Sequence, residues 1–269
     1  MAVAKPLVSV ILPVHRDDHF TKLSIESVLN QGFKDLEIIV LKTDNLELDK
    51  SIAESSRVRI LSTPSNWNLS QKLNMGIDKA EGKYIARMDS DDISHADRIA
   101  KQVLFMDQNP SIGILGTGIK FIGNLPGNED LINKVALLPS GNRELLLHML
   151  NKNPFFHPTV MFRADSLKES GLKYRKSYNR SQDYNLWTRS AGKLEFANLQ
   201  EPLLDYRLHG FQSGYLGALD SNYFSNIAKL FYCIKCIMSF DYRSISAMRI
   251  LPHRICQLLK SWLHRHTEY

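Results

Sequence analysis

The sequence predicts an α/β fold that is built around a mostly parallel sheet. Short apolar runs rich in Val, Ile and Leu alternate with stretches whose apolar residues recur at helical spacing, which is typical of buried strands covered by helices. Glycine or proline closes several of these runs. The 269 residues are 43% hydrophobic, which is enough to build a packed core.

The first part of the chain carries the clearest alternation. Two β-branched apolar runs, LVSVILPV at 7–14 and LEIIVL at 36–41, are expected to be buried strands. A helix is expected between them at 21–31, ending near Gly32. Its apolar face consists of Leu23, Ile25, Val28 and Leu29. The run VRIL at 58–61 predicts a third, short strand.

The next stretch continues the same pattern. Residues 69–80 are expected to form a helix with one apolar face. That face consists of Leu69, Leu73, Ile77 and Ala80. Gly82 then precedes KYIARM at 83–88, which is the fourth expected strand, and another helix is expected at 97–107.

The alternation of strand and helix patterns is less regular after residue 107. A strand punctuated by glycines is expected at 113–123, and the polar stretch at 124–142, which contains Gly and Pro, is expected to be a mobile loop. Helices are expected at 143–151 and 184–191, with a strand at 158–163.

Three carboxylates, those of Asp89, Asp91 and Asp92, directly follow the fourth strand in the stretch ARMDSDDIS. Open α/β sheets bind their ligands at the carboxyl ends of the strands, so the three acids lie where a site is expected. Like charges this close repel one another unless something positive compensates them. Asp89 and Asp91 are two residues apart and would project from the same side if the strand continued.

Two explanations of the acidic cluster compete. Ser94 and Asp97 match a capping box for the helix at 97–107, but capping leaves Asp89, Asp91 and Asp92 unexplained. Carboxylate oxygens are suitable ligands for Mg²⁺ or Mn²⁺. We therefore interpret the cluster as a site for a divalent metal ion and the diphosphate that such an ion binds.

Several segments resemble the glycosyltransferases of family 2, and their order and spacing agree with that family. The segments are VSVILPVHR (8–16), SIESVLNQGFKDLEIIV (24–40), NLSQKLNMGIDKAEGKYIARMDSDDISHADRIAKQ (68–102), HPTVMFR (157–163), QDYNLW (182–187) and LLDYRLH (203–209). The resemblance covers about residues 7–210, with bacterial enzymes of O-antigen, capsule or exopolysaccharide assembly looking most similar. It implies a GT-A fold, in which a Rossmann-like nucleotide-binding half joins an acceptor half, over residues 1–212.

The resemblance also implies roles for the acidic cluster and the first strand. Asp89-Ser90-Asp91 matches the DxD motif of the family, so Asp91 is expected to hold Mn²⁺ or Mg²⁺. Asp89 would then lie at the ribose of the donor or beside the metal ion, with Asp92 behind it. The residues expected to border the nucleobase are Pro13, Val14 and His15.

Two further positions are expected beside the nucleotide. Asn74 matches a position on the helix that flanks the nucleotide pocket, although a solvated helix residue would fit the sequence equally well. The family usually carries an acidic pair followed by Gly-Ser after the second strand, whereas Lys42 and Thr43 stand here. Asp44 is displaced by one or two residues and is expected to reach the base through a changed turn. Uridine is our first choice of nucleoside.

Gln182-Asp183 matches the Glu-Asp motif at the acceptor side of the family. Asp183 is therefore the candidate general base, which would take the proton of the acceptor hydroxyl as it attacks the anomeric carbon. The alternative is that Asp183 caps the helix at 184–191. Gln182 departs from the family, so a second carboxylate is missing beside the base.

A histidine near the metal ion or diphosphate is also expected from the resemblance. His209 in YRLH holds the matching position, and an imidazole can ligate Mn²⁺ or donate a hydrogen bond to phosphate. A structural histidine after a strand is the alternative. His157 is a weaker candidate, and Arg87 and Arg207 would either contact the diphosphate or lie on the surface.

The positive charge is concentrated at the end of the chain. The formal net charge is +6, and residues 221–269 hold seven Lys and Arg residues against two acids. The preceding residues are close to neutral, which argues against a nucleic-acid groove in the main body. All three cysteines also lie here, and their odd number favours a reducing compartment. Cys233 and Cys236 form an isolated CxxC, which we interpret as two apolar helix positions rather than a zinc or redox site.

Residues 213–269 are expected to form a basic, amphipathic helical tail. Apolar residues recur at helical spacing in two segments. They are Phe224, Ile227, Phe231, Ile234 and Met238, followed by Met248, Leu251, Ile255, Leu258, Leu259 and Trp262. No stretch is apolar enough to predict a membrane span. The tail is expected to touch a membrane surface, the alternative being packing on protein.

The sequence therefore predicts a metal-dependent, inverting glycosyltransferase. The donor would be a nucleotide-diphosphate hexose, with UDP favoured, and the acceptor a hydroxyl of a lipid-linked oligosaccharide at the inner face of the cytoplasmic membrane. One alternative is a catalytically inactive module that binds nucleotide sugars, which the altered VLKTDN and Gln182 would suit. The other is a sugar nucleotidyltransferase, although PVHRDDHF lacks the glycines of a triphosphate-binding loop.

Overall fold

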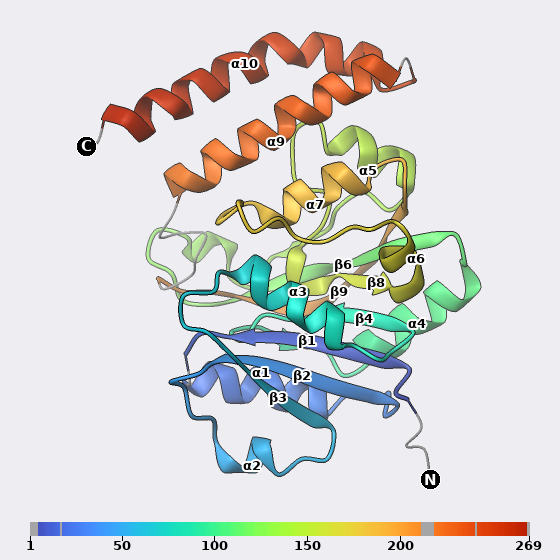
Figure 1. The fold of residues 1–269 in the computed structure, drawn as a ribbon, viewed down its shortest axis with the longest axis vertical. Coiled ribbons are helices and arrows are strands. Elements are labelled where there is room, and N and C mark those ends of the chain that lie inside the picture. The colour runs from blue at the N-terminus through green and yellow to red at the C-terminus, as the bar shows by residue number, and fades with distance from the viewer. Residues whose placement is uncertain (1–4, 17, 211–217, 240, 268–269) are drawn as a thin grey trace.

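The computed structural model describes residues 5–16, 18–210, 218–239 and 241–267 (Figure 1). Its described strands form one nine-stranded sheet in the order β3-β2-β1-β4-β8-β6-β9-β5, with β7 paired to β6. The strands are β1 (Val8–Val14), β2 (Leu36–Thr43), β3 (Val58–Thr63), β4 (Tyr84–Arg87), β5 (Ile93–Ser94), β6 (Ile112–Gly123), β7 (Val135–Ala136), β8 (Met161–Arg163) and β9 (Glu195–Leu208).

The sheet has a parallel half and a mixed half. Strands β3, β2, β1 and β4 are parallel neighbours, which confirms the prediction for the first part of the chain. Beyond β4 the strands β8, β6 and β5 introduce antiparallel pairs, while β6 and β9 are parallel. This combination of a nucleotide-binding half with a second, mixed half is the predicted GT-A arrangement.

Helices cover both faces of the sheet. They are α1 (His19–Leu29), α2 (Lys50–Ala53), α3 (Leu69–Lys79), α4 (Arg98–Gln108), α5 (Asn142–His148), α6 (Ala164–Glu169) and α7 (Gln182–Ser190), with short 3₁₀ helices η1 (Glu129–Leu131) and η2 (His157–Thr159). Alternate residues of β1 face opposite sides of the sheet, so Val10 and Leu12 pack with the core beneath α1 and α4, whereas Ile11 packs with α3, α5 and α7.

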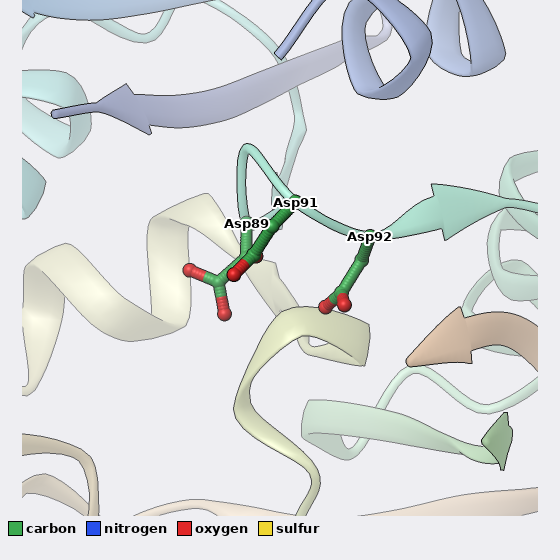
Figure 2. Close-up of side chains that lie close together, drawn as sticks. All are labelled: Asp89, Asp91 and Asp92. Carbon is green, nitrogen blue, oxygen red and sulfur yellow. The ribbon is translucent and has the colours of Figure 1, made fainter. Parts of the chain in front are cut away.

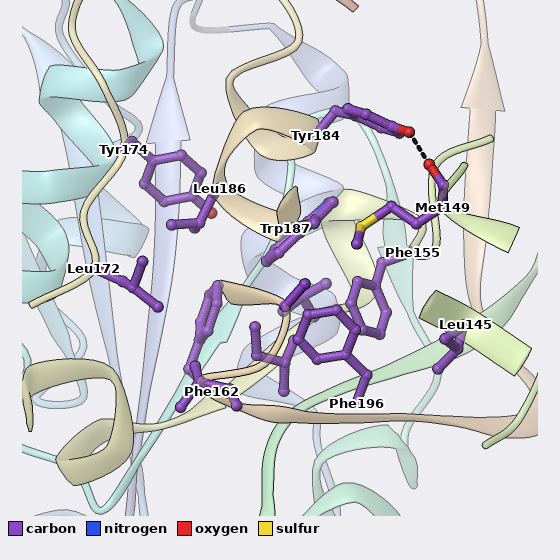
Figure 3. Packing of buried hydrophobic residues seen from close by; sticks show 14 of the residues in the cluster. Leu145, Met149, Phe155, Phe162, Leu172, Tyr174, Tyr184, Leu186, Trp187 and Phe196 are labelled. Carbon is purple, nitrogen blue, oxygen red and sulfur yellow. Dashed lines mark hydrogen bonds between the residues drawn. The ribbon is translucent and has the colours of Figure 1, made fainter. Parts of the chain in front are cut away.

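Trp187 of α7 lies at the centre of the core that joins α5 and α7 to the sheet (Figure 3). Its ring packs edge-on to Phe155, with ring centroids 5.1 Å apart, and stacks on Phe162 of β8. The Tyr184 hydroxyl donates a hydrogen bond to the carbonyl of Met149. This packing fixes the first turn of α7, where the sequence predicts the general base, against the sheet.

The predicted capping box is wrong. Ser94 lies in β5, which pairs with β9, and Gln31 donates a hydrogen bond to its hydroxyl. Asp97 holds the N-cap position of α4 without a side-chain capping bond, and its carboxylate pairs with Lys101 instead. The sheet therefore uses Ser94 for pairing, and capping does not explain any of the acids in this stretch.

The C-terminal helices α9 (Ala218–Ser239) and α10 (Ser244–Thr267) confirm the predicted helical appendage. They lie side by side at one end of the molecule, above α5 and α7 (Figure 1). Helix α9 packs on α7 through one face, with Ala228, Tyr232, Cys233 and Cys236 buried in the core. The predicted boundary at 212/213 and the side chains of Phe224 and Trp262 lie outside the described residues.

The two cysteines of the CxxC are free thiols inside this interface, as the interpretation of apolar helix positions requires. The tail is not a candidate for spanning a bilayer, since none of the described helices joins sufficient length to sufficient apolarity. The predicted mobile loop at 124–142 contains η1 and the short strand β7, which pairs with β6.

Candidate active site

A cavity of about 660 Å³ opens where the two halves of the sheet meet. Its walls come from the end of β1, the starts of α1, α3 and α7, the turn after β4, the region of η2 and the end of β9, and helix α9 contributes two further residues. Of the predicted site residues, the walls contain Pro13, His15, Asp89, Asp91, Asp183 and His209.

The three acids come together in the turn that follows β4. Strand β4 ends at Arg87, so Asp89 and Asp91 do not share a strand face, but the turn brings both carboxylates to the cavity (Figure 2). Each of the three acids offers one oxygen within 4.8 Å of the other two. Asp92 is buried behind the cavity, where its Oδ1 accepts a hydrogen bond of 2.8 Å from the backbone N–H of Arg207.

The charges of this cluster are incompletely compensated. Arg87 is buried, so it is not a surface charge, and its guanidinium makes two hydrogen bonds to the Asp89 carboxylate. Burial and the neighbouring Asp91 nevertheless raise the pKa of Asp89 to about 6, although Arg87 acts in the opposite direction. Burial also raises the pKa of Asp92, and its Oδ2 is a buried oxygen without a hydrogen-bond partner among the described residues.

These features fit a divalent cation. Hard carboxylate oxygens converge, one buried oxygen has no donor, and the raised pKa values show that negative charge is disfavoured there without a cation. Asp91 and Asp89, which face the cavity, would hold such an ion, and Asp92 would support the turn from behind.

The end of β9 closes over this turn. His209 Nε2 lies 2.9 Å from Asp91 Oδ2, and Arg207 Nε donates a hydrogen bond of 2.8 Å to the Asp91 carbonyl. The Arg207 guanidinium lies 4.4 Å from the centre of the Phe20 ring, and that ring also packs beside His209. Arg207 therefore holds the acidic turn in place by its hydrogen bond to the backbone carbonyl of Asp91.

Asp183 lies across the cavity in the first turn of α7. The N-cap position belongs to Ser181, whose φ is 53°, so Asp183 is not the capping residue. Asn153 Nδ2 donates a hydrogen bond of 2.6 Å to its Oδ2. Burial raises the pKa of the Asp183 carboxyl, while the hydrogen bonds from Tyr184 and Asn153 act in the opposite direction. A half-buried carboxylate that faces the cavity and is held this way is suited to accept a proton.

The residues predicted for the nucleotide occupy different environments. Pro13 and His15 line the cavity, whereas the Val14 side chain is fully buried in the core. Asp44 lies on the exposed turn after β2 and is not among the cavity-lining residues. Asn74 is half-buried and is not among the cavity-lining residues; its side chain accepts a hydrogen bond of 2.9 Å from the Tyr174 N–H and donates one of 2.8 Å to the Tyr174 carbonyl.

His157 also lines the cavity, and its Nε2 lies 2.8 Å from the Tyr174 hydroxyl. Burial holds the pKa of this imidazole well below its usual range, so the ring is neutral near pH 7. Its packing against Trp187, with ring centroids 5.9 Å apart, makes it part of the cavity wall as well as of the core.

Among the residues of this region that sequence reasoning missed, three have polar or charged groups with a clear place in the site. Asn153 holds Asp183, Lys229 of α9 lines the cavity, and the ammonium of Lys72 on α3 lies 3.3 Å from Nδ1 of His15, which lines the cavity. Lys72 and Lys229 each interrupt an apolar helical pattern. A lysine at such a position indicates a side chain that points into the protein rather than into solvent. Asn153 gave no signal, because it lies between predicted elements.

Comparison with known proteins identifies the class. Residues 9–171 match the family described as Glycosyl transferase family 2, so the chain belongs to that family and is a glycosyltransferase. It is 37% identical over 213 residues to the O-antigen biosynthesis glycosyltransferase WbnJ of Escherichia coli, covering 76% of this chain and 80% of WbnJ. It is 28% identical over 210 residues to the E. coli UDP-Gal:alpha-D-GlcNAc-diphosphoundecaprenol beta-1,3-galactosyltransferase, covering 75% of this chain and 74% of that enzyme.

Solved structures confirm the fold. Residues 1–349 of S. aureus TarS in complex with UDP-GlcNAc align with a TM-score of 0.68 at 15% identity, over 93% of this chain and 72% of that one. The chain spans 43% of the longer TarS structure. The mannosyltransferase PcManGT of Pyrobaculum calidifontis, in complex with GDP-Man and Mn²⁺, aligns with a TM-score of 0.61 at 14% identity, over 96% of this chain and 74% of that one.

Proposed function

We propose that this glycosyltransferase is metal-dependent and inverting, and that it transfers a hexose from a UDP-sugar to a saccharide hydroxyl. The observation that carries the proposal is the placement of Asp183 in the same cavity as Asp89 and Asp91. One carboxylate can then serve the acceptor while the acidic turn serves the donor diphosphate. The relative named for UDP-Gal, and the UDP-GlcNAc complex of TarS, support this donor class.

The side chains of the cavity divide the reaction between them. Asp183, held by Asn153, accepts the proton of the acceptor hydroxyl as the hydroxyl oxygen bonds to the anomeric carbon. The bond from that carbon to the diphosphate breaks in the same displacement, the electron pair leaves with UDP, and the configuration inverts. His209 orients Asp91, and Arg87 holds Asp89. A bound Mn²⁺ or Mg²⁺ supplies positive charge to the leaving diphosphate.

The proposed acceptor is a lipid-linked oligosaccharide in the synthesis of a cell-surface polysaccharide. Support comes from the relatives, because WbnJ is named for O-antigen biosynthesis and the galactosyltransferase for a diphosphoundecaprenol acceptor. Such an acceptor would be met at the inner face of the cytoplasmic membrane.

The outer faces of α9 and α10 support contact with a membrane surface. Large apolar side chains are exposed there, with Phe231 at 65% and Met238 at 72% of their full accessibility. The others are Ile234, Ile245, Met248, Ile255 and Leu259. Arg249 and Lys260 are exposed on α10. Apolar residues mixed with cations suit the interface of an anionic bilayer, so we propose peripheral attachment through this face.

The test of the proposed function is nucleotide release from a panel of sugar nucleotides with Mn²⁺, Mg²⁺ or EDTA. We expect slow hydrolysis of one UDP-sugar that requires the metal ion and is lost in Asp91→Asn. Asp78→Asn is the matched control, since Asp78 pairs with Lys173 on the surface. Full activity of Asp91→Asn with an unchanged metal requirement would overturn the mechanism. Binding of UDP with Mn²⁺ but no turnover with any acceptor would identify an inactive binding module instead.

A further inference from the structure

Helix α9 of the C-terminal appendage forms part of the cavity wall. Ser225 and Lys229 line the same cavity as Asp183, so the appendage is a component of the site as well as a cover. The Lys229 ammonium lies 5.6 Å from the centre of the Tyr184 ring, and Tyr184 directly follows Asp183. Lys229 therefore lies on the side of the cavity that α7 and Asp183 form.

In the part of the chain that the structure describes, Lys229 lacks the carboxylate partner that several surface lysines have. Lys22, Lys83 and Lys173 each pair with a carboxylate on the surface, whereas no ion pair to Lys229 is found within the described ranges. Its side chain is half-buried, and burial together with nearby Arg254 lowers the pKa of its ammonium to about 8. A desolvated cation without a counter-charge is costly, and an anionic ligand in the cavity would compensate it.

The orientation of α9 indicates where that anion comes from. Phe231, two residues beyond Lys229, is 65% exposed on the outer face proposed to meet the membrane. One helix therefore presents apolar side chains to the lipid side and a cation to the cavity. An acceptor whose sugar reached Asp183 while its lipid stayed at this face would carry its phosphate groups past the cavity-lining side of α9.

We propose that Lys229 binds a phosphate group of the acceptor, so that the site selects saccharides carried on a lipid phosphate or diphosphate over uncharged glycosides. The inference rests on the proposed function for the identity of the acceptor side. It gives the appendage a second role, because α9 would both attach the enzyme to the membrane and recognise the charged link between the lipid and the saccharide.

The test is binding of decyl diphosphate, measured by isothermal titration calorimetry on the full chain with UDP and Mn²⁺ at saturation so that the donor end is filled. We expect saturable binding to the wild type, weakened at least about tenfold in Lys229→Gln and largely restored in Lys229→Arg. Decyl maltoside, which is uncharged, should bind both Lys229→Gln and the wild type equally. Lys260→Gln removes an exposed cation of α10 and is the matched control.

Each contrary result is informative. Equal affinity of the wild type and Lys229→Gln for decyl diphosphate would overturn the inference, and so would a complete lack of binding to the wild type. An equal loss in Lys260→Gln would assign the binding to surface charge and headgroup attraction rather than to the cavity. Donor hydrolysis, measured separately with Asp91→Asn, tests the proposed function, so the two failures are distinguishable.

Discussion

His209 at the end of β9 contacts Asp91 in the turn after β4, with 2.9 Å between Nε2 and Oδ2. The two residues are 118 positions apart in the sequence, and Asp92 and Arg207 make a second link between the same two segments. The nucleotide-binding half thus supplies the acids, and the last strand of the sheet orients them. A substitution at the end of β9 should therefore alter the position of the Asp91 carboxylate in the cavity.

We predict that His209→Ala weakens activation by the metal ion. The imidazole either ligates the ion or orients the Asp91 carboxylate, and loss of such a partner typically costs about 10–100-fold in metal affinity or activity. The measurement is the Mn²⁺ concentration that gives half-maximal donor hydrolysis, which should rise by that factor while the maximal rate changes less.

The chain offers a matched control for this substitution. His95 makes the same type of contact to Asp205, at 2.9 Å between Nε2 and Oδ1, in the same part of the sheet but outside the cavity lining. His95→Ala should leave the Mn²⁺ requirement unchanged. Equal Mn²⁺ requirements in His209→Ala and the wild type would contradict the assignment of His209.

A second prediction concerns the base. Asp183→Asn should lower transfer by about 10²–10⁴-fold, since the amide cannot accept the proton of the acceptor, while UDP binding is retained. Asn153→Ala should have a smaller and different effect. Its side chain donates a hydrogen bond that favours the charged carboxylate, so its loss should raise the pKa of Asp183 further.

The pH dependence separates these two variants. In the wild type, kcat/KM should fall as the pH is lowered through the raised pKa of Asp183, because only the carboxylate is active. In Asn153→Ala this acidic limb should move to higher pH, with the plateau near its original value. An unmoved acidic limb would show that a group other than Asp183 controls it.

The sequence predicted the elements whose signals are local. Strands β1 and β2 are continuous apolar runs, and the acids at 89–92 follow β4 directly, so both the parallel half and the acidic turn were expected. Strand β9 was not expected as a 14-residue strand, because Gln200, Glu201 and Pro202 interrupt its apolar pattern where its register with β6 shifts. The link from Asp92 to Arg207 joins residues 115 positions apart, and no spacing in one sequence reveals such a contact.

A third prediction concerns stability. The fully buried ammonium of Lys72 has only long contacts, 3.3 Å to His15 Nδ1 and 3.5 Å to the Val14 carbonyl, and burial lowers its pKa. Lys72→Met keeps the length of the side chain and removes the desolvated charge, so the free energy of unfolding should rise by about 1 kcal/mol. Urea unfolding measures it.

Lys42→Met is the comparison for this substitution. The Lys42 ammonium donates a hydrogen bond of 2.5 Å to the Leu46 carbonyl, and its loss would leave the turn after β2 without that donor. Lys42→Met should therefore lower the free energy of unfolding by about 1 kcal/mol. A loss of stability in Lys72→Met would mean that the Lys72 ammonium is better satisfied than its contacts indicate.

Thiol reactivity tests the packing of α9. Cys233 and Cys236 are fully buried and free, and burial raises the pKa of Cys233 to about 11, whereas Cys256 is exposed on α10. Ellman's reagent should therefore react rapidly with one thiol per chain in the native protein and with three after unfolding. Rapid reaction of three thiols in the native protein would show that α9 does not stay packed on α7.

The exposed face of the appendage gives the last prediction. Replacing Phe231 and Met238 together by serine removes two large apolar side chains from the outer face of α9, which α7 does not contact through these residues. We expect the affinity for vesicles containing phosphatidylglycerol, measured by co-sedimentation, to fall at least about tenfold. Each apolar side chain that is buried in the membrane interface contributes about 1.5–3 kcal/mol. Leu104→Ser is the control, because Leu104 is 60% exposed on α4, which lies beside the middle of the sheet, apart from α9 and α10. If the double variant and Leu104→Ser bound these vesicles as tightly as the wild type, the outer face of α9 would not be the membrane contact. The outer face of α9 would then be available for a protein partner. The position of a bilayer would no longer explain why a phosphate group reaches Lys229.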